Sequence, residues 1–546
     1  MVARFVRDYV VPKALYGNGS IWNHVPNMEG TTRAAVMAGY RPGENAVTFD
    51  GATDLPDGVS TRLSYSVEMI GIPLPEVGVS VGSRDGVHGT GMIPVGSGTY
   101  TNPGSSSQWL VYGAGASRTK STALVDISSI RLVYGNFHDQ GTVVPSELAG
   151  PYPIVVRASV EYPAGVPKLN ANSNTSWAAS GDYTIGDQVT NGGSSWVATA
   201  SSTNQTPALD SAYWAQVQFY PAYFRGGTAT DVTIQPGHVA VSEPIGINPS
   251  IPKGSAFYIN NVVQPMSGGV MNQGSFPRSG HTTKVSAGEY EAHVAVGNNN
   301  VPDITTATAS TVTGDGSPGY APVAILGVPA QANTPVVYLC GDSIMNGTGD
   351  DFVLGSEFGG WGVRLLTDNP AAPTRYLYAH LRSARGSSRG MFQYGPGWQR
   401  RLALAAGCTH VIDNWATNDV AAPRTFALMQ ADALARWTAL ARMGLIVYAS
   451  TCVPRTTSTD SWATEANQTP AANFGPNSAW SAYNAWVRTV PSPLTGVIDA
   501  AAATADVATG TVWRASYTAD GTHPTAAAHI AIAQSVQAVR FFGKPI

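Results

Sequence analysis

The order of predicted secondary structure after residue 331 constrains the fold of this 546-residue chain more than any other feature. Short apolar segments typical of buried strands alternate there with stretches of helical periodicity. One such stretch, Thr425–Met443, is followed by Gly444, which suits a helix C-cap. This alternation predicts a parallel sheet covered by helices, and so an α/β domain over residues 331–546, with strands at Pro335–Cys340, Thr409–Ile412 and Leu445–Ser450.

The chain before residue 330 has a different texture. The whole sequence contains 59 glycines and 37 prolines, above the average usage of about 7% and 5%, and turn-forming clusters separate short alternating segments in this half. The segments predict strands at Ser129–Tyr134, Ile154–Tyr162 and Asp231–Gln235. We therefore expect an all-β, jelly-roll-like sandwich, built from residues 1–169 and 218–330, whose first 120 residues are turn-rich and carry no recognisable chemistry.

A small module, residues 170–217, interrupts this sandwich. Its pattern is Trp177, then Tyr183-Thr184-Ile185-Gly186-Asp187-Gln188-Val189, Trp196 and a closing Trp214. The pattern resembles the small carbohydrate-binding modules of families 5 and 12, which implies aromatic faces stacked on sugar rings. We expect Trp177 and Trp214 inside, and Tyr183 and Trp196 exposed as substrate-binding residues. The alternative is that all these aromatics form the core of a module too small to have another one, which then acts as a spacer.

Three polar blocks in the α/β region carry chemistry. Ser343, in Gly341-Asp342-Ser343, follows a predicted strand, and the carboxyl end of a parallel strand is where α/β sites form. We expect a helix to begin at Ile344–Asn346 and turn its amides toward an oxyanion. Asp520 precedes His523 by three residues, a spacing that lets the carboxylate orient the imidazole. Asn418 follows another strand and can donate to an oxyanion. Alone, each block is also ordinary turn, cap or loop chemistry.

Together and in this order, the blocks resemble the SGNH (GDSL-type) hydrolase superfamily over residues 333–546. The resemblance implies a three-layer α/β fold in which Ser343 is the nucleophile and its backbone amide an oxyanion donor. It makes Asn418 a second donor, His523 the general base and then acid, and Asp520 the residue that orients His523. It implies no cofactor.

The chain departs from this family pattern at two places. The glycine expected two residues before Asn418 is Ala416. The glycine of the oxyanion hole is ambiguous, since the segment from Arg385 offers Gly386 and Gly390. We favour Gly386, because it follows the predicted strand Arg375–Ala379 more closely; either glycine can also be a simple turn residue.

Two other segments match the Gly-x-Ser-x-Gly elbow of α/β-hydrolases. Gly78–Gly82 lies among turns without a following helix, so its context is wrong. Gly386–Gly390 lies inside the α/β domain and makes Ser388 a rival nucleophile. Because a turn cluster rather than a strong helix follows it, we expect Ser343 to react.

Composition excludes several other classes. With 31 basic and 35 acidic residues the net charge is −4, which does not favour a nucleic-acid partner. No metal-ligand spacing and no phosphate-binding loop occurs, so we expect neither a metal nor a cofactor. No apolar run approaches the roughly 20 residues of a membrane span. Cys340, Cys408 and Cys452 suit small buried apolar residues, not a disulfide framework.

These features predict an enzyme, a serine esterase that removes O-acyl groups, most simply O-acetyl, from a polysaccharide or other glycan through an acyl-enzyme. The alternatives are a general short-chain carboxylesterase or lipase, and a glycan-binding, phage-tail-like protein with a vestigial hydrolase fold. Met1–Lys13 lacks the apolar core of a signal peptide. We expect an extracellular protein, either secreted or carried on a particle such as a phage, and leave its oligomeric state open.

Overall fold

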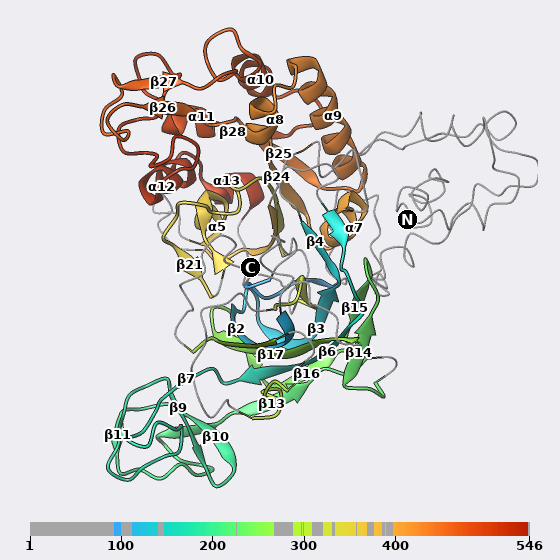
Figure 1. Ribbon diagram of the computed structural model, residues 1–546, viewed down its shortest axis with the longest axis vertical. Helices are drawn as coiled ribbons and strands as arrows, with labels where there is room; N and C mark the ends of the chain where they lie inside the picture. Colours follow the sequence, from blue (N-terminus) through green and yellow to red (C-terminus); the bar gives the residue numbers. More distant parts are fainter. Residues whose placement is uncertain are drawn as a thin grey trace, which may run out of the picture.

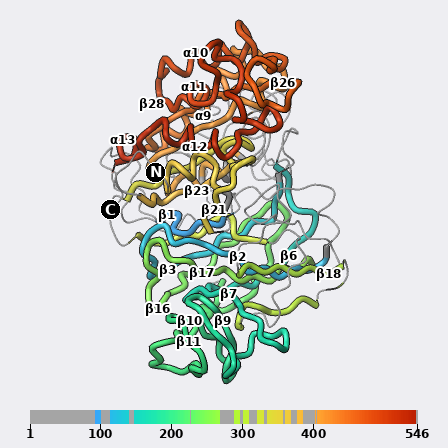
Figure 2. The backbone as a smooth tube through the Cα atoms, turned by 90° about the vertical axis from the view of Figure 1, so that its left-hand side faces the viewer, coloured from blue at the N-terminus to red at the C-terminus, as the bar shows by residue number. Residues whose placement is uncertain are grey.

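The computed structural model describes residues 92–99, 112–139, 147–224, 227–266, 288–295, 298, 300–307, 320–329, 334–355, 357–367, 376–384, 388 and 397–543. They form three parts that follow one another along the longest axis of the molecule (Figures 1 and 2). A small β module lies at one end, antiparallel sheets lie in the middle, and an α/β domain lies at the other end.

The middle part contains two antiparallel sheets in the described residues. The first has the order β13-β6-β17-β2-β18, with β14 also paired to β6; its strands are β2 Tyr112–Thr122, β6 Ile154–Tyr162, β13 Gln218–Pro221, β14 Asp231–Ile234, β17 Ala256–Pro265 and β18 Tyr290–Ala295. The second has the order β1-β19-β3-β15, with β16 paired to β3; its strands are β1 Ile93–Pro94, β3 Ile127–Gly135, β15 Val239–Val241, β16 Ile245–Ile251 and β19 Ala324–Gly327.

The three strands expected in this half are confirmed as parts of β3, β6 and β14. Apolar side chains of both sheets belong to one core, among them Leu132 of β3, Val156 of β6 and Ile259 of β17. The alternation of apolar and polar residues therefore identified the buried faces correctly. The jelly-roll connection stays a prediction.

The small module leaves and re-enters the first sheet between two neighbouring strands. β6 and β13 pair antiparallel, with Tyr162 opposite Gln218, so the chain between them returns close to where it left. Its sheet has the order β12-β10-β9-β7 and begins four residues before the predicted start at 170; the strands are β7 Val166–Pro167, β9 Asp187–Asn191, β10 Ser194–Ala198 and β12 Trp214–Gln216. A separate pair joins β8 Asp182–Tyr183 and β11 Ser202–Thr203.

A buried polar network attaches this module to the first sheet. Arg118 of β2 makes a bidentate ion pair with Glu161 of β6, with both N–O distances 2.8 Å. Gln188 of β9 accepts from Arg118 at 3.0 Å and donates to Glu161 at 2.8 Å, while Asn260 of β17 donates to Glu161 at 2.9 Å. Burial favours the neutral acid, but Arg118 and the amide donors hold the pKa of Glu161 below its usual value. The module is thus joined by side chains as well as by its two connections.

The α/β domain is built on a parallel sheet of order β23-β20-β24-β25-β28. The strands are β20 Val336–Gly341, β23 Ala379–Ala384, β24 His410–Asn414, β25 Ile446–Ser450 and β28 Gly496–Ile498. The described helices are α5 Gly360–Thr367, α7 Gly397–Ala405, α8 Thr417–Ala421, α9 Phe426–Arg442, α10 Ala479–Arg488, α11 Ala500–Thr504, α12 Ala526–Gln534 and α13 Ala538–Phe542. The α/β prediction is confirmed.

Helices cover both faces of this sheet (Figure 1). Side chains of β20 alternate between two cores: Tyr338 belongs to the core that contains Trp437 of α9, and Leu339 belongs to the core that contains Trp361 of α5 and Ile532 of α12. A central strand that is buried on both faces explains its continuous apolar run. Within the described ranges, no helix is long and apolar enough to cross a membrane.

Two local expectations in this domain are wrong. The strand predicted at Arg375–Ala379 shares only Ala379 with the observed strand β23. The predicted strand ends at the residue where β23 begins. The segment after Ser343 forms turns up to residue 349 instead of a helix. Gly347 and Gly349 have φ of 86° and 88°, a backbone conformation that ends any right-handed helix there.

The sheets and the α/β domain share an interface with a buried ion pair. Arg401 of α7 lies 2.7 Å from Glu147, which belongs to the hairpin of β4 Phe137–Asp139 and β5 Glu147–Ala149, and both side chains are almost fully buried. The apolar core of the second sheet continues past this pair to Trp398 of α7.

We predict that Arg401→Met destabilises the protein by about 3–5 kcal/mol, because it leaves Glu147 as a buried charge without its guanidinium. The double variant Glu147→Leu/Arg401→Met removes both charges and should recover most of this loss. Urea unfolding monitored by tryptophan fluorescence measures both. If the single and the double variant lose the same free energy of unfolding, the loss does not come from the buried charge of Glu147 left without its partner.

Candidate active site

Ser343 lies at the carboxyl edge of the parallel sheet, two residues after Gly341, the last residue of β20. Gly341 is required there because a Cβ on it would approach the carbonyl oxygen of Asn414 in β24 to 2.6 Å. The amide of Asp342 donates to the same carbonyl at 3.3 Å. These contacts turn the chain sharply, and the Ser343 side chain remains half-exposed at the edge.

The imidazole of His523 meets the hydroxyl of Ser343, although the two residues are 180 positions apart. Ser343 Oγ lies 2.9 Å from His523 Nε2, and His523 Nδ1 lies 2.6 Å from Asp520 Oδ2. Because a carboxylate only accepts, Nδ1 carries the proton and Nε2 accepts from the serine hydroxyl. The structure therefore brings together Ser343, His523 and Asp520 in the order expected.

The turn from Asp520 to His523 is organised by the carboxylate itself. The backbone amides of Thr522 and His523 both donate to Asp520 Oδ1 at 2.8 Å, while Oδ2 accepts from the imidazole. Partial burial alone would raise the pKa of Asp520, but these donors hold it well below its usual range. Asp520 therefore stays ionised behind the imidazole.

The turns after Ser343 pack directly on the histidine segment. A Cβ on Gly349 would collide with the carbonyl oxygen of Pro524, so the two backbones are in close contact. Buried His529 of α12 accepts from the amide of Trp361 at 3.0 Å and lies 3.1 Å from the carbonyl of Thr348, to which Nε2 donates. Burial lowers the pKa of His529, which keeps this bridge neutral. Sequence reasoning did not single out His529, because its helical neighbours are apolar or small.

Asp342, beside the nucleophile, is a buried carboxyl group. It accepts from the amide of Ile344 at 2.9 Å and from the hydroxyl of Thr417. Burial raises its pKa to about 6, against these hydrogen bonds. Thr417 and Asn418 begin α8, so the bond from Thr417 places the predicted oxyanion donor Asn418 at the same sheet edge as Ser343.

Ala416, where the resemblance led us to expect a glycine, has a backbone conformation that favours glycine. Its φ is 120° and its ψ is −33°, outside the regions that a residue with a Cβ normally adopts. It is also buried. The turn before Asn418 is therefore strained.

The rival serine, Ser388, occupies a different environment. It is buried, its hydroxyl accepts from Arg436 at 3.2 Å, and its amide donates to Asp419 at 3.0 Å. Both nitrogens of His523 are engaged by Ser343 and Asp520, which leaves none for Ser388. The predicted oxyanion glycine Gly386, its alternative Gly390 and the Gly78–Gly82 segment lie outside the described residues.

The predicted sugar-contacting residues of the small module are not exposed. Tyr183 is 4% and Trp196 is 6% exposed, and they form the module core with Val189 and Trp214. The Tyr183 and Trp214 rings pack edge to face at 5.1 Å. The expected exposure of Tyr183 and Trp196 is wrong, because so small a module needs these rings for its interior. Trp177, expected inside, is only partly buried against this core.

No group of side chains in the described ranges could hold a metal ion. What the site offers is a partly exposed hydroxyl, an imidazole that can take its proton, and an ionised carboxylate behind the imidazole. Such an arrangement supports nucleophilic attack on an acyl carbon.

Neither a protein-family model nor a curated protein matches the chain. Among solved structures, it is similar to a GDSL-like lipase from Bacteroides thetaiotaomicron VPI-5482 (14% identity, 38% of this chain and 88% of the lipase, TM-score 0.25). It is also similar to the psychrotrophic esterase EstA from Pseudoalteromonas sp. (16% identity, 37% and 93%, TM-score 0.25). A Bacillus subtilis protein matches over 77% of this chain and 94% of its own length, at 12% identity and TM-score 0.26. These similarities are distant.

We predict that Asp342→Asn changes how stability depends on pH. The raised pKa means that the folded protein takes up a proton between about pH 6 and pH 4, so wild-type Asp342 penalises folding at pH 7 and the penalty disappears on acidification. The stability difference between variant and wild type should therefore shift by on the order of 3 kcal/mol between pH 7 and pH 4. Urea unfolding across this range measures it, with Asp210→Asn as an exposed control. A pH-independent difference would contradict a buried, titrating Asp342.

We predict that Ala416→Gly raises stability by about 1 kcal/mol, because glycine adopts the observed backbone without strain. The matched control is Ala433→Gly, at an equally buried alanine inside α9, which should lose about 1 kcal/mol or more. Thermal unfolding of the two variants separates these signs. A loss at both positions would show that the turn at Ala416 is not strained.

Proposed function

We propose that this protein is a serine hydrolase of O-acyl esters that works through an acyl-enzyme. The observation that carries the proposal is the continuous hydrogen-bond chain from Ser343 through His523 to Asp520 at a partly exposed sheet edge. The chain itself supplies every residue that this chemistry requires.

In the first half of the reaction, Ser343 Oγ attacks the acyl carbon while its proton passes to His523 Nε2. Asp520, held ionised, stabilises the imidazolium that forms. The Ser343 amide and the Asn418 side chain are proposed to hold the oxyanion, with Gly386 as the third donor. The intermediate then expels the alcohol, which takes the proton from His523.

In the second half, water attacks the acyl-Ser343 ester and gives a proton to His523 Nε2. Collapse of this intermediate breaks the bond to Ser343 Oγ, which regains the proton, and releases the carboxylic acid. The same imidazole thus serves as base and acid in both halves.

The proposed substrate is an O-acetylated glycan. The support is the inserted module, whose residues 177–214 resemble small carbohydrate-binding modules in sequence. Since Tyr183 and Trp196 are internal, sugar contact is proposed for the partly buried aromatics of its core, Trp177 and Tyr213. A polysaccharide substrate implies work outside the cell, by a secreted or particle-borne protein.

Substrate comparison tests the glycan proposal against its alternatives. Faster acetate release from acetylated polysaccharides than from equimolar p-nitrophenyl acetate supports a carbohydrate esterase. Activity on the small ester alone supports a general esterase, and no turnover of either supports a vestigial site.

We predict that Ser343→Ala lowers kcat by at least about 10⁴-fold, because it removes the attacking oxygen. Ser388→Ala should keep wild-type activity while costing about 1 kcal/mol of stability through the lost bond from Arg436. Acetate release and mass-spectrometric location of an organophosphonate label check both. Full activity in Ser343→Ala, or a label on Ser388, would refute the assignment.

A further inference from the structure

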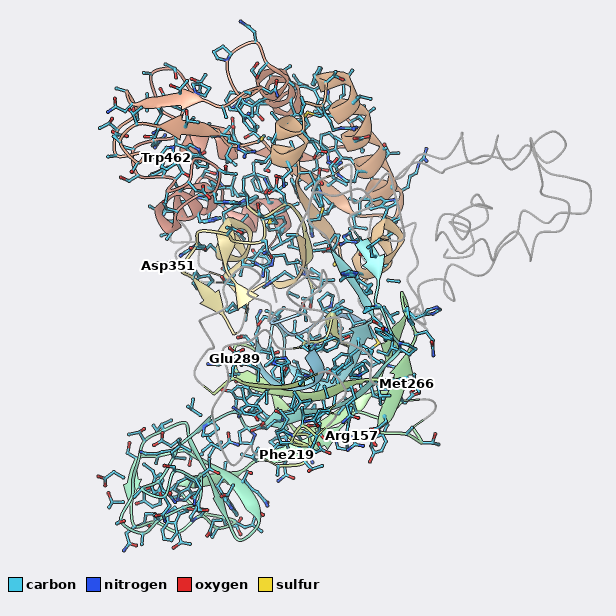
Figure 3. The ribbon with its side chains drawn as sticks, in the orientation of Figure 1. Arg157, Phe219, Met266, Glu289, Asp351 and Trp462 are labelled. Carbon is cyan, nitrogen blue, oxygen red and sulfur yellow. The ribbon has the colours of Figure 1, made fainter. Side chains whose placement is uncertain are left out.

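A hairpin outside the predicted blocks packs on the turn that carries the triad acid and base. β26 Thr456–Ser458 pairs with β27 Gln468–Pro470, and Trp462 lies in the loop between them (Figure 3). The amide of Thr456 donates to the carbonyl of Gly521 at 2.9 Å. Gly521 directly follows Asp520, so the hairpin is bonded to the Asp520–His523 turn itself.

The indole of Trp462 is fitted against this turn. A Cβ placed on Gly521, whose φ is 78°, would come within 2.8 Å of Trp462 Cζ2 and would collide with the carbonyl of Thr456. Trp462 Nε1 donates to Thr456 Oγ1 at 3.0 Å, which fixes the plane of the ring. No side chain at position 521 is compatible with this contact.

The loop holds Trp462 in an unfavourable backbone conformation. Ser461 and Trp462 have φ of 56° and 59°, in the left-handed region that non-glycine residues rarely adopt. The amide of Trp462 donates to Ser458 Oγ at 2.8 Å, and its carbonyl accepts from the amide of Ser516 at 2.8 Å. Such strain persists only where neighbouring contacts determine it, and it is common at functional sites.

The hairpin adds to the bonds that Asp520, Thr518 and Trp513 make within and behind this turn. The Asp520 side chain is 53% exposed and that of His523 is 24% exposed, so burial of their own side chains does little to hold them. We propose that Trp462 is a positioning residue, whose indole fixes the Asp520–His523 turn so that Nε2 faces Ser343. For its catalytic consequence this inference rests on the proposed function.

The test compares Trp462→Ala with Trp486→Ala. Trp486 of α10 is also a partly buried indole of this domain, and it stacks on Trp437 of α9 at 5.1 Å. Trp462→Ala should lower kcat by about 10- to 100-fold with KM nearly unchanged, as expected for a small displacement of a catalytic base. Trp486→Ala should lose stability but keep kcat. Trp462→Phe, which keeps a ring but loses the Nε1 bond, should lie between wild type and Trp462→Ala.

A second readout does not depend on turnover. The low-field proton resonance of His523 Nδ1, which reports its short bond to Asp520, should shift or broaden in Trp462→Ala and stay unchanged in Trp486→Ala. An unchanged resonance and unchanged kcat in Trp462→Ala would overturn the positioning role. If wild type shows no hydrolysis and no phosphonate label, the proposed function fails, and the resonance still decides whether Trp462 positions the turn.

Discussion

The contact between Ser343 and His523 depends on the close approach of two backbone segments. Where they meet, at Gly349 on the carbonyl of Pro524, there is no room for a side chain. On the strand side, Gly341 lies equally close to the carbonyl of Asn414 in β24. The neutral bridge of His529 then joins the serine turns to α5 and α12. The Ser343 hydroxyl is thus held 2.9 Å from His523 Nε2 by the packing of residues around the two.

Backbone strain occurs on two sides of this site. Ala416 precedes the Thr417–Asn418 segment, and Ser461 and Trp462 lie above the Asp520–His523 turn; all three have positive φ without being glycine. Neighbouring bonds hold the conformation of Trp462, since its amide bonds to Ser458 and its carbonyl to Ser516. The loop that contacts the Asp520–His523 turn is therefore fixed by its surroundings.

Periodicity predicted the α/β domain because the buried strands and α9 follow simple local rules, down to Gly444 after the last turn of α9. The resemblance of the polar blocks to the SGNH hydrolases predicted the meeting of Ser343, Asp520 and His523, whereas the strand pattern predicted only that Ser343 lies at the carboxyl edge of the sheet. Local rules failed where contacts between distant segments determine the position of a side chain. The burial of Tyr183 and Trp196 follows from the small size of the module, and the contact of Trp462 with Gly521 joins segments with no shared pattern.

The sheets in the middle of the molecule connect the small module with the α/β domain. A buried ion pair takes part in each of the two connections. Arg118 and Glu161 meet Gln188 of the small module, and Glu147 meets Arg401 of the α/β domain. Buried pairs contribute little net stability, but they require one geometry, because any displacement leaves a charge without its partner. For the α/β domain this holds directly, since Arg401 and Glu147 lie on opposite sides of the interface. The small module is held through Gln188, whose displacement would remove a hydrogen-bond partner from both Arg118 and Glu161.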